Sequence, residues 1–146
     1  MLKSVLSPII NTLQIYTDGA IRPQRGLSGL GAIVRDNDGR ICNWWSTQSG
    51  PMTNNEAEYH AAIMALERLQ SIRPQKIIIF SDSEIMVQQM QGQSRVRAAS
   101  LIKPHTRLKQ LVACFPSVHF FHIPRERNRL ADALANDAAD GIGGKP

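Results

Sequence analysis

Two aspartates follow short runs that are rich in apolar residues. Asp18 comes directly after residues 13–17 and Asp82 follows residues 76–80 after Ser81, and both runs have the length and composition of β-strands. Where such strands lie parallel in an open α/β sheet, their carboxyl ends meet at the edge at which ligands bind. The alternative for Asp82 is that its side chain caps a helix beginning at Ser83. The pattern therefore indicates two carboxylates that converge on one edge, unless capping accounts for the second.

Glu58 stands on the predicted apolar face of a helix. Ala62, Ala65 and Leu66 follow it at offsets of four, seven and eight residues, which places them on the same side. Glu56 is turned about 200° away by helix geometry and points elsewhere. A buried carboxylate is costly unless it is paired or bound to a metal. No Lys or Arg shares this face, so a metal cation is the natural partner of Glu58, and an ion pair with an arginine remote in the sequence is the alternative.

Asp132 falls in the first turn of the last predicted helix, among small residues that allow this helix to approach a sheet closely. The helix dipole is an alternative reason for an acid at that position. Four converging carboxylates would repel one another, and Mg²⁺ relieves the repulsion because it takes oxygen ligands. Two such ions about 4 Å apart can stabilise the attacking and the leaving oxygen of an in-line displacement at phosphorus. The residues by themselves therefore predict a metal-dependent phosphodiesterase that uses Asp18, Glu58, Asp82 and Asp132.

The rest of the pattern predicts the elements that hold these acids. Thr53 and Glu56 have the spacing of a capping box at the start of a helix, and Asp38-Gly39 predicts a hairpin turn. The predicted strands are residues 13–17, 29–35, 40–49, 76–80 and 118–122, the predicted helices are residues 53–72, 83–91, 100–114 and 129–140, and residues 19–28 are predicted to form a polar loop. The order favours three antiparallel strands followed by strands parallel to the first. We therefore expect an α/β fold with a five-stranded mixed sheet and helices on both faces.

Length and composition fit one domain with a basic surface. The chain has 146 residues, of which 42% are hydrophobic, and a formal charge of +5 that suits a polyanionic partner without requiring one. Residues 1–12 are expected to be an N-terminal extension, 13–140 the domain and 141–146 a flexible tail. Cys42 and Cys114 have no metal-ligand spacing and are expected to be buried. No apolar run is long enough to cross a membrane and no signal peptide is evident, which predicts a cytoplasmic protein without membrane contact.

Four segments resemble the successive motifs of the ribonuclease H type 1 family, in that family's order and spacing. They are Tyr16-Thr17-Asp18-Gly19-Ala20, Thr53-Asn54-Asn55-Glu56-Ala57-Glu58-Tyr59, Ser81-Asp82-Ser83 and the segment from His122 to Ala135. The resemblance covers residues 13–140. It implies the ribonuclease H-like fold and hydrolysis of the RNA strand of RNA/DNA hybrids. It also implies two Mg²⁺ ions, replaceable by Mn²⁺, and products with 5′-phosphate and 3′-hydroxyl ends.

The resemblance also implies roles for individual residues. The implied metal ligands are the same four that the physical argument selects, namely Asp18, Glu58, Asp82 and Asp132. The residues implied to contact the hybrid are Gly19, Ala20, Thr53, Asn54 and Asn55. Asparagine amides both donate and accept, which suits 2′-hydroxyls and minor-groove base edges.

The chain departs from the family pattern in three places. The loop after the first aspartate carries Gln24 where relatives usually have Asn, so Gln24 is the expected substitute in substrate binding. Residues 94–105 hold three basic residues and no cluster of Trp, which predicts that the basic protrusion of some members is absent. Before Asp132 many members place a mobile His, whereas this chain has Arg125 in the loop and His122 at the end of a strand. We expect Arg125 to assist catalysis and His122 to have a packing role.

Two alternatives for the function stay open. A related nuclease would cut double-stranded RNA also or instead, since the fold alone does not separate these activities. A non-catalytic hybrid-binding module is the alternative of another class. A neutral residue at one of the four acidic positions would support it, and none is present. We further expect a monomer without an obligate protein partner.

Overall fold

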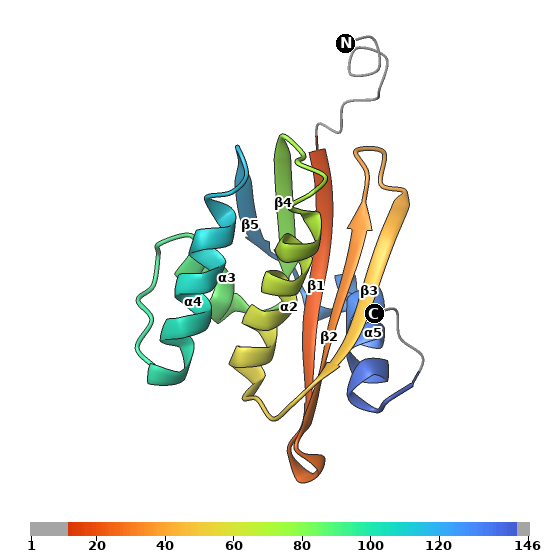
Figure 1. The fold of residues 1–146 in the computed structure, drawn as a ribbon, viewed down its shortest axis with the longest axis vertical. Helices are drawn as coiled ribbons and strands as arrows, with labels where there is room; N and C mark the ends of the chain where they lie inside the picture. Colours follow the sequence, from red (N-terminus) through yellow and green to blue (C-terminus); the bar gives the residue numbers. More distant parts are fainter. Residues whose placement is uncertain (1–11, 143–146) are drawn as a thin grey trace.

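The computed structural model describes residues 12–142, in which five strands form one sheet (Figure 1). The predictions for residues 1–11 and 143–146 lie outside this part of the chain. The strands are β1 (Thr12–Arg22), β2 (Leu27–Arg35), β3 (Ile41–Ser49), β4 (Lys76–Ser81) and β5 (Val118–His122). The helices are α2 (Asn54–Leu69), α3 (Glu84–Met90), α4 (Ala99–Val112) and α5 (Arg129–Ala139), with short 3-10 turns η1 (Pro23–Arg25) and η2 (Arg125–Arg127).

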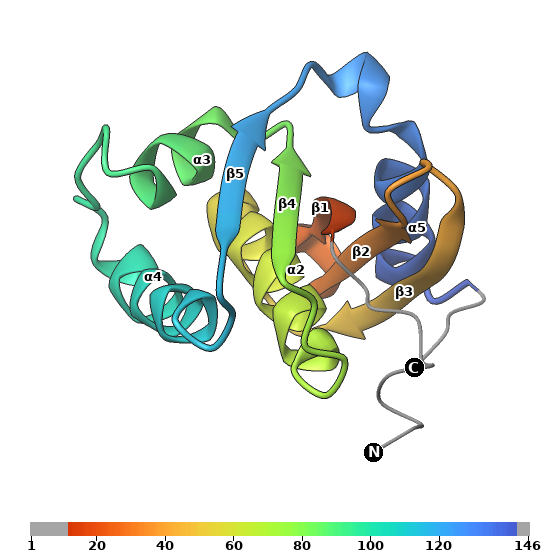
Figure 2. The same ribbon diagram turned by 90° about the horizontal axis from the view of Figure 1, so that it is seen from above.

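The sheet has the strand order β3-β2-β1-β4-β5 and mixes both pairing directions. β1, β2 and β3 pair antiparallel, whereas β4 and β5 run parallel to β1. α2, with α4 packed beside it, covers one face of the sheet, and α5 covers part of the other (Figure 2). The expected α/β class, the five-stranded mixed sheet and the helices on both faces are therefore confirmed.

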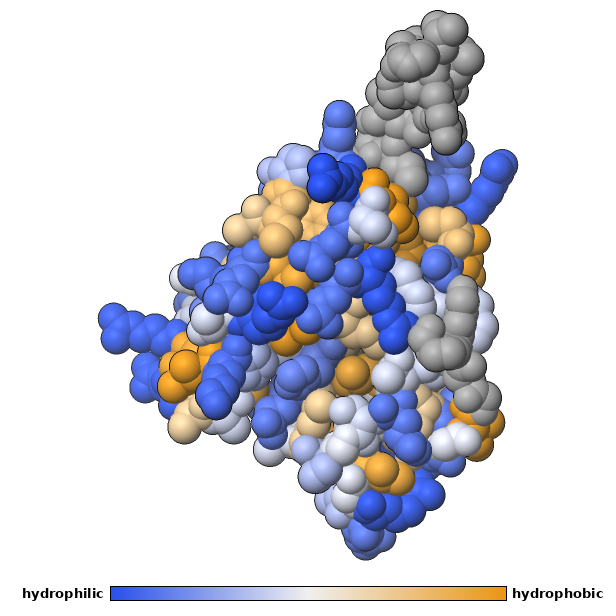
Figure 3. All heavy atoms as spheres, viewed as in Figure 1, coloured by the Kyte–Doolittle hydropathy of each residue, from blue (hydrophilic) through white to orange (hydrophobic). Residues whose placement is uncertain are grey.

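The main core lies between the sheet and α2. Ile15 of β1, Ile79 of β4 and Leu66 of α2 are fully buried there. Adjacent strand residues face opposite ways, so in β3 Trp45 is buried while Trp44 is 37% exposed, as the alternation predicts. Over α2 and α4, the outer surface in Figure 3 is mainly hydrophilic. Within residues 12–142 no helix combines the length and the apolar character needed to span a bilayer.

β1 is longer than the sequence pattern indicates. Residues 19–28 were expected to form a loop, but β1 continues to Arg22 and β2 begins at Leu27. The parallel pairing of β1 with β4 ends at Thr17, while its antiparallel pairing with β2 continues to the end of the strand. Asp18-Gly19 is therefore not a strand end, because β2 supplies the hydrogen bonds that β4 no longer offers.

The cysteines and the helix ends also differ from expectation. Cys42 and Cys114 are both exposed, the first on the edge strand β3 and the second just after α4. The helix predicted for residues 53–72 ends at Leu69, and the chain then turns through Arg73, which has a positive φ of 55°. Pro74 thus marks the end of the turn rather than the end of the helix.

Small residues let α5 lie against the sheet. A Cβ atom added to Gly29 of β2 would lie 1.9 Å from the carbonyl oxygen of Ala135, and one added to Gly31 would lie 2.5 Å from that of Ala131. The backbone of α5 therefore touches β2 directly, with no side chain between them. This close packing fixes the position of the first turn of α5, which carries Asp132.

Replacing Gly29 by Ala is expected to destabilise the fold by about 2 kcal/mol, because the new methyl group overlaps a helix backbone that cannot move without shifting all of α5. Urea unfolding measures the change. Gly50→Ala is the matched control, since a Cβ there meets nothing within 4 Å, and its free energy of unfolding should change by less than about 0.5 kcal/mol. Equal stability of the two variants would show that α5 is not held by this contact.

Candidate active site

Three carboxyl groups meet at one edge of the sheet. Asp18, Glu58 and Asp82 each offer one oxygen, and these oxygens lie within 4.8 Å of one another. Asp18 is 4% exposed and Glu58 6% exposed, while Asp82 is half-buried. The convergence predicted from the strand ends and from the apolar face of the helix is therefore present in the structure.

The pairing of β1 with β4 brings the two aspartates together. The last paired residues are Thr17 and Ser81, so Asp18 and Asp82 come next on neighbouring parallel strands. Asp18 lies within β1, at the level where β4 ends. The edge at which ligands bind in open α/β sheets is thus formed here by the end of one strand and the middle of another.

Gly19 joins Glu58 to this edge. A Cβ atom at Gly19 would lie 2.6 Å from the carbonyl carbon of Ala57, so only glycine allows α2 to approach β1 this closely. The Gly19 N–H donates to Asp18 Oδ1 and to Glu58 Oε1, each at 3.0 Å. One backbone donor therefore orients both buried carboxyl groups.

The capping alternative for Asp82 is not borne out. Ser83 is the N-cap of α3, and its hydroxyl accepts from the Met86 N–H at 3.3 Å. The Asp82 side chain makes no cap. Helix capping therefore does not explain an acid at this position, and its nearness to Asp18 remains to be explained by a ligand.

Asp132 lies in the first turn of α5, outside the group of three, with a side chain 35% exposed. Its Oδ1 accepts from Asn136 Nδ2 at 3.1 Å and lies 3.9 Å from a guanidinium nitrogen of Arg125. After burial and the charge of Asp82, Asp132 also contributes to the raised pKa of Asp18. Asp132 is therefore less buried than Asp18 and Glu58.

Burial and mutual repulsion make the charged forms of these acids costly. Burial, followed by the charges of Asp18 and Asp82, raises the pKa of Glu58 to about 10. Burial and then the charge of Asp82 raise the pKa of Asp18 to about 7. Burial also raises the pKa of Asp82, although the positive charge of Arg125 opposes the shift.

Neither buried acid has a cationic partner in the protein. Within residues 12–142, the ion pairs formed by Lys and Arg include none to Asp18 or Glu58. The alternative of an ion pair between Glu58 and a remote arginine is therefore excluded for the described part of the chain. Oxygen donors that lack a cation, at this spacing, fit a hard divalent metal ion.

The cavity in front of these acids has a volume of about 390 Å³ and includes other predicted site residues. Asn54, from the first turn of α2, lines it. Arg125 and His122 line it from the opposite side, and both are exposed. The structure thus places Arg125 beside the acids, and it places His122 there too rather than in the packed interior that the sequence suggested.

Of the other predicted substrate-binding residues, Gly19 also lines this cavity, whereas Ala20, Gln24, Thr53 and Asn55 do not. Thr53 caps α2, since its hydroxyl accepts from Glu56 N–H at 3.2 Å and the Glu56 carboxylate accepts from Thr53 N–H at 2.9 Å. Asn55 follows in the first turn. Ala20 is buried against α5, so its methyl group serves packing. Gln24 is exposed in η1 and lines a separate cavity with neighbouring residues of that turn. Contact of these residues with a substrate stays a prediction.

Asn128 is a site residue that the sequence analysis missed. It is 1% exposed, and its Nδ2 donates to the Thr17 carbonyl at 2.8 Å. The hydrogen bond ties the start of α5 to β1 directly before Asp18, so it helps to position both Asp18 and Asp132. Its place just before the last helix and four residues before Asp132 was the available signal, but that pattern also fits an ordinary helix cap.

Sequence and structure comparisons agree on one family. A profile described as reverse transcriptase-like matches residues 16–138. Ribonuclease HI of Halobacterium salinarum is 34% identical over 125 residues, which cover 86% of this chain and 63% of that protein. The crystal structure of ribonuclease H1 from the same archaeon superposes with a TM-score of 0.85 at 32% identity, covering 90% of this chain and 100% of the other. The chain belongs to the ribonuclease H type 1 family.

Two further ribonuclease H structures are similar to this chain in fold and sequence. The N-terminal ribonuclease H domain of Rv2228c from Mycobacterium tuberculosis superposes with a TM-score of 0.84 at 32% identity, covering 90% of this chain and 95% of the other. LC11-RNase H1, isolated from compost and solved with an RNA/DNA hybrid, superposes with a TM-score of 0.82 at 37% identity, covering 88% and 97%. The chain spans only 35% of the whole bifunctional protein Rv2228c, to which it is 35% identical over 127 residues.

The raised pKa values predict how this ribonuclease H domain responds to pH without metal. Below about pH 4 the acids are protonated in both folded and unfolded chains, and no penalty arises. As the pH rises toward 7 the unfolded chain loses the Asp18 proton while the folded chain keeps it, so stability falls, and Glu58 extends the loss toward higher pH. In EDTA the melting temperature should therefore drop between about pH 5 and about pH 8.

Asp82→Asn tests the cause of that drop. Removing one negative charge should raise the melting temperature in EDTA at about pH 8 and make the dependence on pH shallower. Thermal unfolding followed by circular dichroism measures both. An unchanged or lower melting temperature of the variant at the higher pH would mean that repulsion among these acids is not significant.

Proposed function

We propose that this chain hydrolyses the RNA strand of RNA/DNA hybrids, leaving 5′-phosphate and 3′-hydroxyl ends. The observation that carries the proposal is the meeting of three carboxyl groups, two of them buried without a cationic partner, at the ligand-binding edge of a ribonuclease H type 1 domain. LC11-RNase H1, which has been solved with an RNA/DNA hybrid, supports the choice of substrate. We further propose that the domain acts as a cytoplasmic monomer.

Two Mg²⁺ ions, replaceable by Mn²⁺, fit the site, with Asp18, Glu58, Asp82 and Asp132 as the ligands. When bound, such ions activate a water molecule and stabilise the charge that develops on the oxygens of the scissile phosphate. The oxygens of Asp18 and Glu58 are held in place by the Gly19 N–H, so these two ligands are oriented before any ion arrives. Asp132 is less buried than these two and lies in the first turn of α5, outside the residues that line the cavity.

The start of α2 is suited to bind the hybrid. The N-terminus of a helix carries a partial positive charge and free N–H groups that favour a phosphate. Asn54 lines the cavity of the acids, and Thr53 and Asn55 are its neighbours at the start of α2. We propose that the two asparagine amides bind 2′-hydroxyls and minor-groove base edges of the hybrid, and that Thr53 helps to hold a phosphate of the DNA strand.

A cleavage assay with end-labelled duplexes tests the proposal. The chain should cut the RNA strand of a hybrid with Mg²⁺ and leave it intact in EDTA, and product ends can be read by sensitivity to phosphatase. Preferred cleavage of double-stranded RNA would replace the proposed substrate. Tight binding of the hybrid with no cleavage in Mg²⁺ or Mn²⁺ would show a binding module instead.

Substitution of single ligands should nearly abolish cleavage. Asp18→Asn, Glu58→Gln and Asp82→Asn keep the shape of the side chain but remove a charge that holds the ions, so rates should fall by about a hundredfold or more. Glu56→Gln is the matched control on the same helix. It should stay active, because the Glu56 side chain is engaged with Thr53 and points away from the cluster. Activity like that of the wild type in any of the three variants would remove that residue from the site.

Arg125 and His122 can be separated by kinetics. Arginine stays protonated at ordinary pH and cannot transfer a proton, so Arg125 is proposed to attract phosphate and assist product release. Arg125→Ala should slow turnover about tenfold, less than loss of a ligand, and the pH–rate profile should lack a step near pH ~6.5, the ordinary value of an imidazole. Steady-state kinetics of Arg125→Ala and His122→Ala across pH provide the measurement. Loss of activity in His122→Ala alone would make the histidine the assisting group.

A further inference from the structure

Three aromatic side chains form a row across the sheet on the face that carries α5. Tyr16, Phe80 and Phe121 occupy paired positions on β1, β4 and β5. The rings of Tyr16 and Phe80 are stacked, with centroids 4.8 Å apart and planes inclined by 25°. The centroids of Phe80 and Phe121 lie 6.2 Å apart at 31°. We call these three residues the aromatic row.

Most of this row is not covered by the described part of the chain. α5 packs against β1, β2 and β3, and within residues 12–142 no helix lies over β4 and β5 on this face (Figure 2). Phe121 is 48% exposed, and Tyr16 and Phe80 are partly exposed. Contiguous apolar patches on a protein surface can mark binding sites, and Phe121 is the exposed end of this one.

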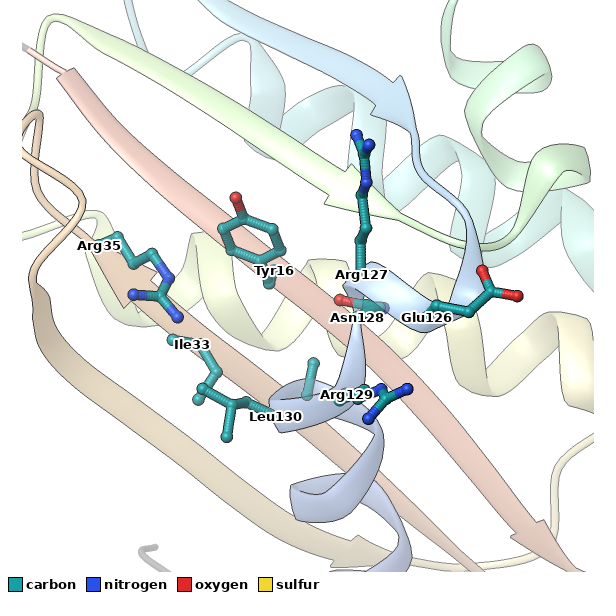
Figure 4. Close-up of a pocket in the computed structure, with 9 residues that line it drawn as sticks. Tyr16, Ile33, Arg35, Glu126, Arg127, Asn128, Arg129 and Leu130 are labelled. Atoms are coloured by element: carbon teal, nitrogen blue, oxygen red, sulfur yellow. The ribbon is translucent and has the colours of Figure 1, made fainter.

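Arginines border the row at its β1 end. A cavity of about 220 Å³ lies beside Tyr16 and is lined also by Arg35, Arg127 and Arg129, which Figure 4 labels. The guanidinium of Arg35 lies 5.6 Å from the centre of the Tyr16 ring. The side chains of Arg127 and Arg129 are exposed and take part in no ion pair or hydrogen bond within the described residues. Positive charge without a protein partner therefore lies next to exposed aromatic rings.

This surface adjoins the active site. Tyr16 precedes Asp18 by two residues and Phe80 precedes Asp82 by two, so along each strand the row lies about 7 Å from the level of the acids. Side chains two apart on a strand point to the same face. Glu126 of η2 lines both the cavity of the acids and the cavity beside Tyr16. A strand that passes the acids can therefore continue over η2 onto the aromatic row.

We propose that the aromatic row and its arginines bind single-stranded nucleic acid that continues from the hybrid at the active site. A base stacks on the ring of Phe121, the exposed end of the row, and the arginines contact the neighbouring phosphates, which is the combination used by surfaces that bind single strands without sequence preference. The net charge of +5 complements such a polyanion. The inference rests on the proposed function, because the hybrid supplies the single strand. Binding to the surface can nevertheless be measured without cleavage.

Direct binding is measured by fluorescence anisotropy in EDTA, where no cleavage occurs. The probes are labelled oligouridylate and oligothymidylate of about 10 nucleotides. Phe121→Ala and Arg127→Ala should each weaken binding about tenfold, in line with the loss of one stacking or phosphate contact. Ile102→Ala and Arg97→Ala are the matched controls, since Ile102 is an exposed apolar residue on α4 and Arg97 an exposed arginine, and neither lines the cavity beside Tyr16. Both should bind like the wild type. Tighter binding of oligouridylate would identify the RNA strand as the one that the surface binds, and tighter binding of oligothymidylate the DNA strand.

Equal affinity of the wild type and both row variants for these probes would overturn the inference. So would a dimer of the wild type that dissociates in Phe121→Ala by sedimentation, because a second copy would then be the occupant. The Michaelis constant for hybrids with a single-stranded extension, compared with blunt hybrids, gives the link to catalysis. The wild type should show a lower value for the extended hybrid, and Phe121→Ala should lose that difference.

Failure of the two proposals can be told apart. If the blunt hybrid is cut but the row variants bind oligonucleotides like the wild type, the inference fails and the proposed function stands. If no duplex is cut but the row variants lose oligonucleotide binding, the proposed function fails and the binding surface stands.

Discussion

The burial of carboxyl groups beside one another is the constraint on which this structure depends. Asp18 and Glu58 lie almost out of contact with water, and one backbone N–H serves both. Desolvation and like charge make their ionised forms costly, which the raised pKa values express. Protonation relieves this cost in the metal-free domain, and a cation of high charge density would relieve it while the acids stay ionised. The arrangement therefore fits a divalent metal site whose candidate ligands are held in place by the fold.

The rest of the fold can be understood as the scaffold that assembles those ligands. β1 and β4 place two acids at one level of the sheet, and Gly19 allows α2 to bring in the third. On the other face Gly29 and Gly31 hold α5 against β2, while Asn128 ties the start of that helix to β1. Because each contact involves the backbone of at least one partner, little freedom is left in the positions of the carboxyl groups. Rigid elements rather than loops thus carry the acids, with the exception of Asp82, which follows directly after β4.

The acids could be predicted from the sequence because each leaves a local signal. Glu58 interrupts an apolar helix face, and the two aspartates follow strand-like runs. Each of these signals also has an ordinary explanation, such as helix capping. Only contacts that the folded structure shows decide between the two. Ser83, not Asp82, caps α3, and only the structure shows this. The extension of β1 past Asp18 was missed because its hydrogen bonds come from β2, and an Asp-Gly pair resembles a strand end when that partner is not seen. The aromatic row could not be predicted from the sequence for a related reason, since it depends on the register of three strands that are far apart in the chain.

The central claim is that a divalent ion takes the place of the protons held by the buried acids. Calorimetric titration of Mg²⁺ into the chain near neutral pH, in two buffers that differ in ionisation enthalpy, measures the protons released on binding. Glu58, with a pKa raised to about 10, holds a proton in the metal-free domain. The account predicts release of about one proton or more, and a smaller release from Glu58→Gln. Heats that are the same in both buffers, or equal proton release by the wild type and the variant, would contradict it.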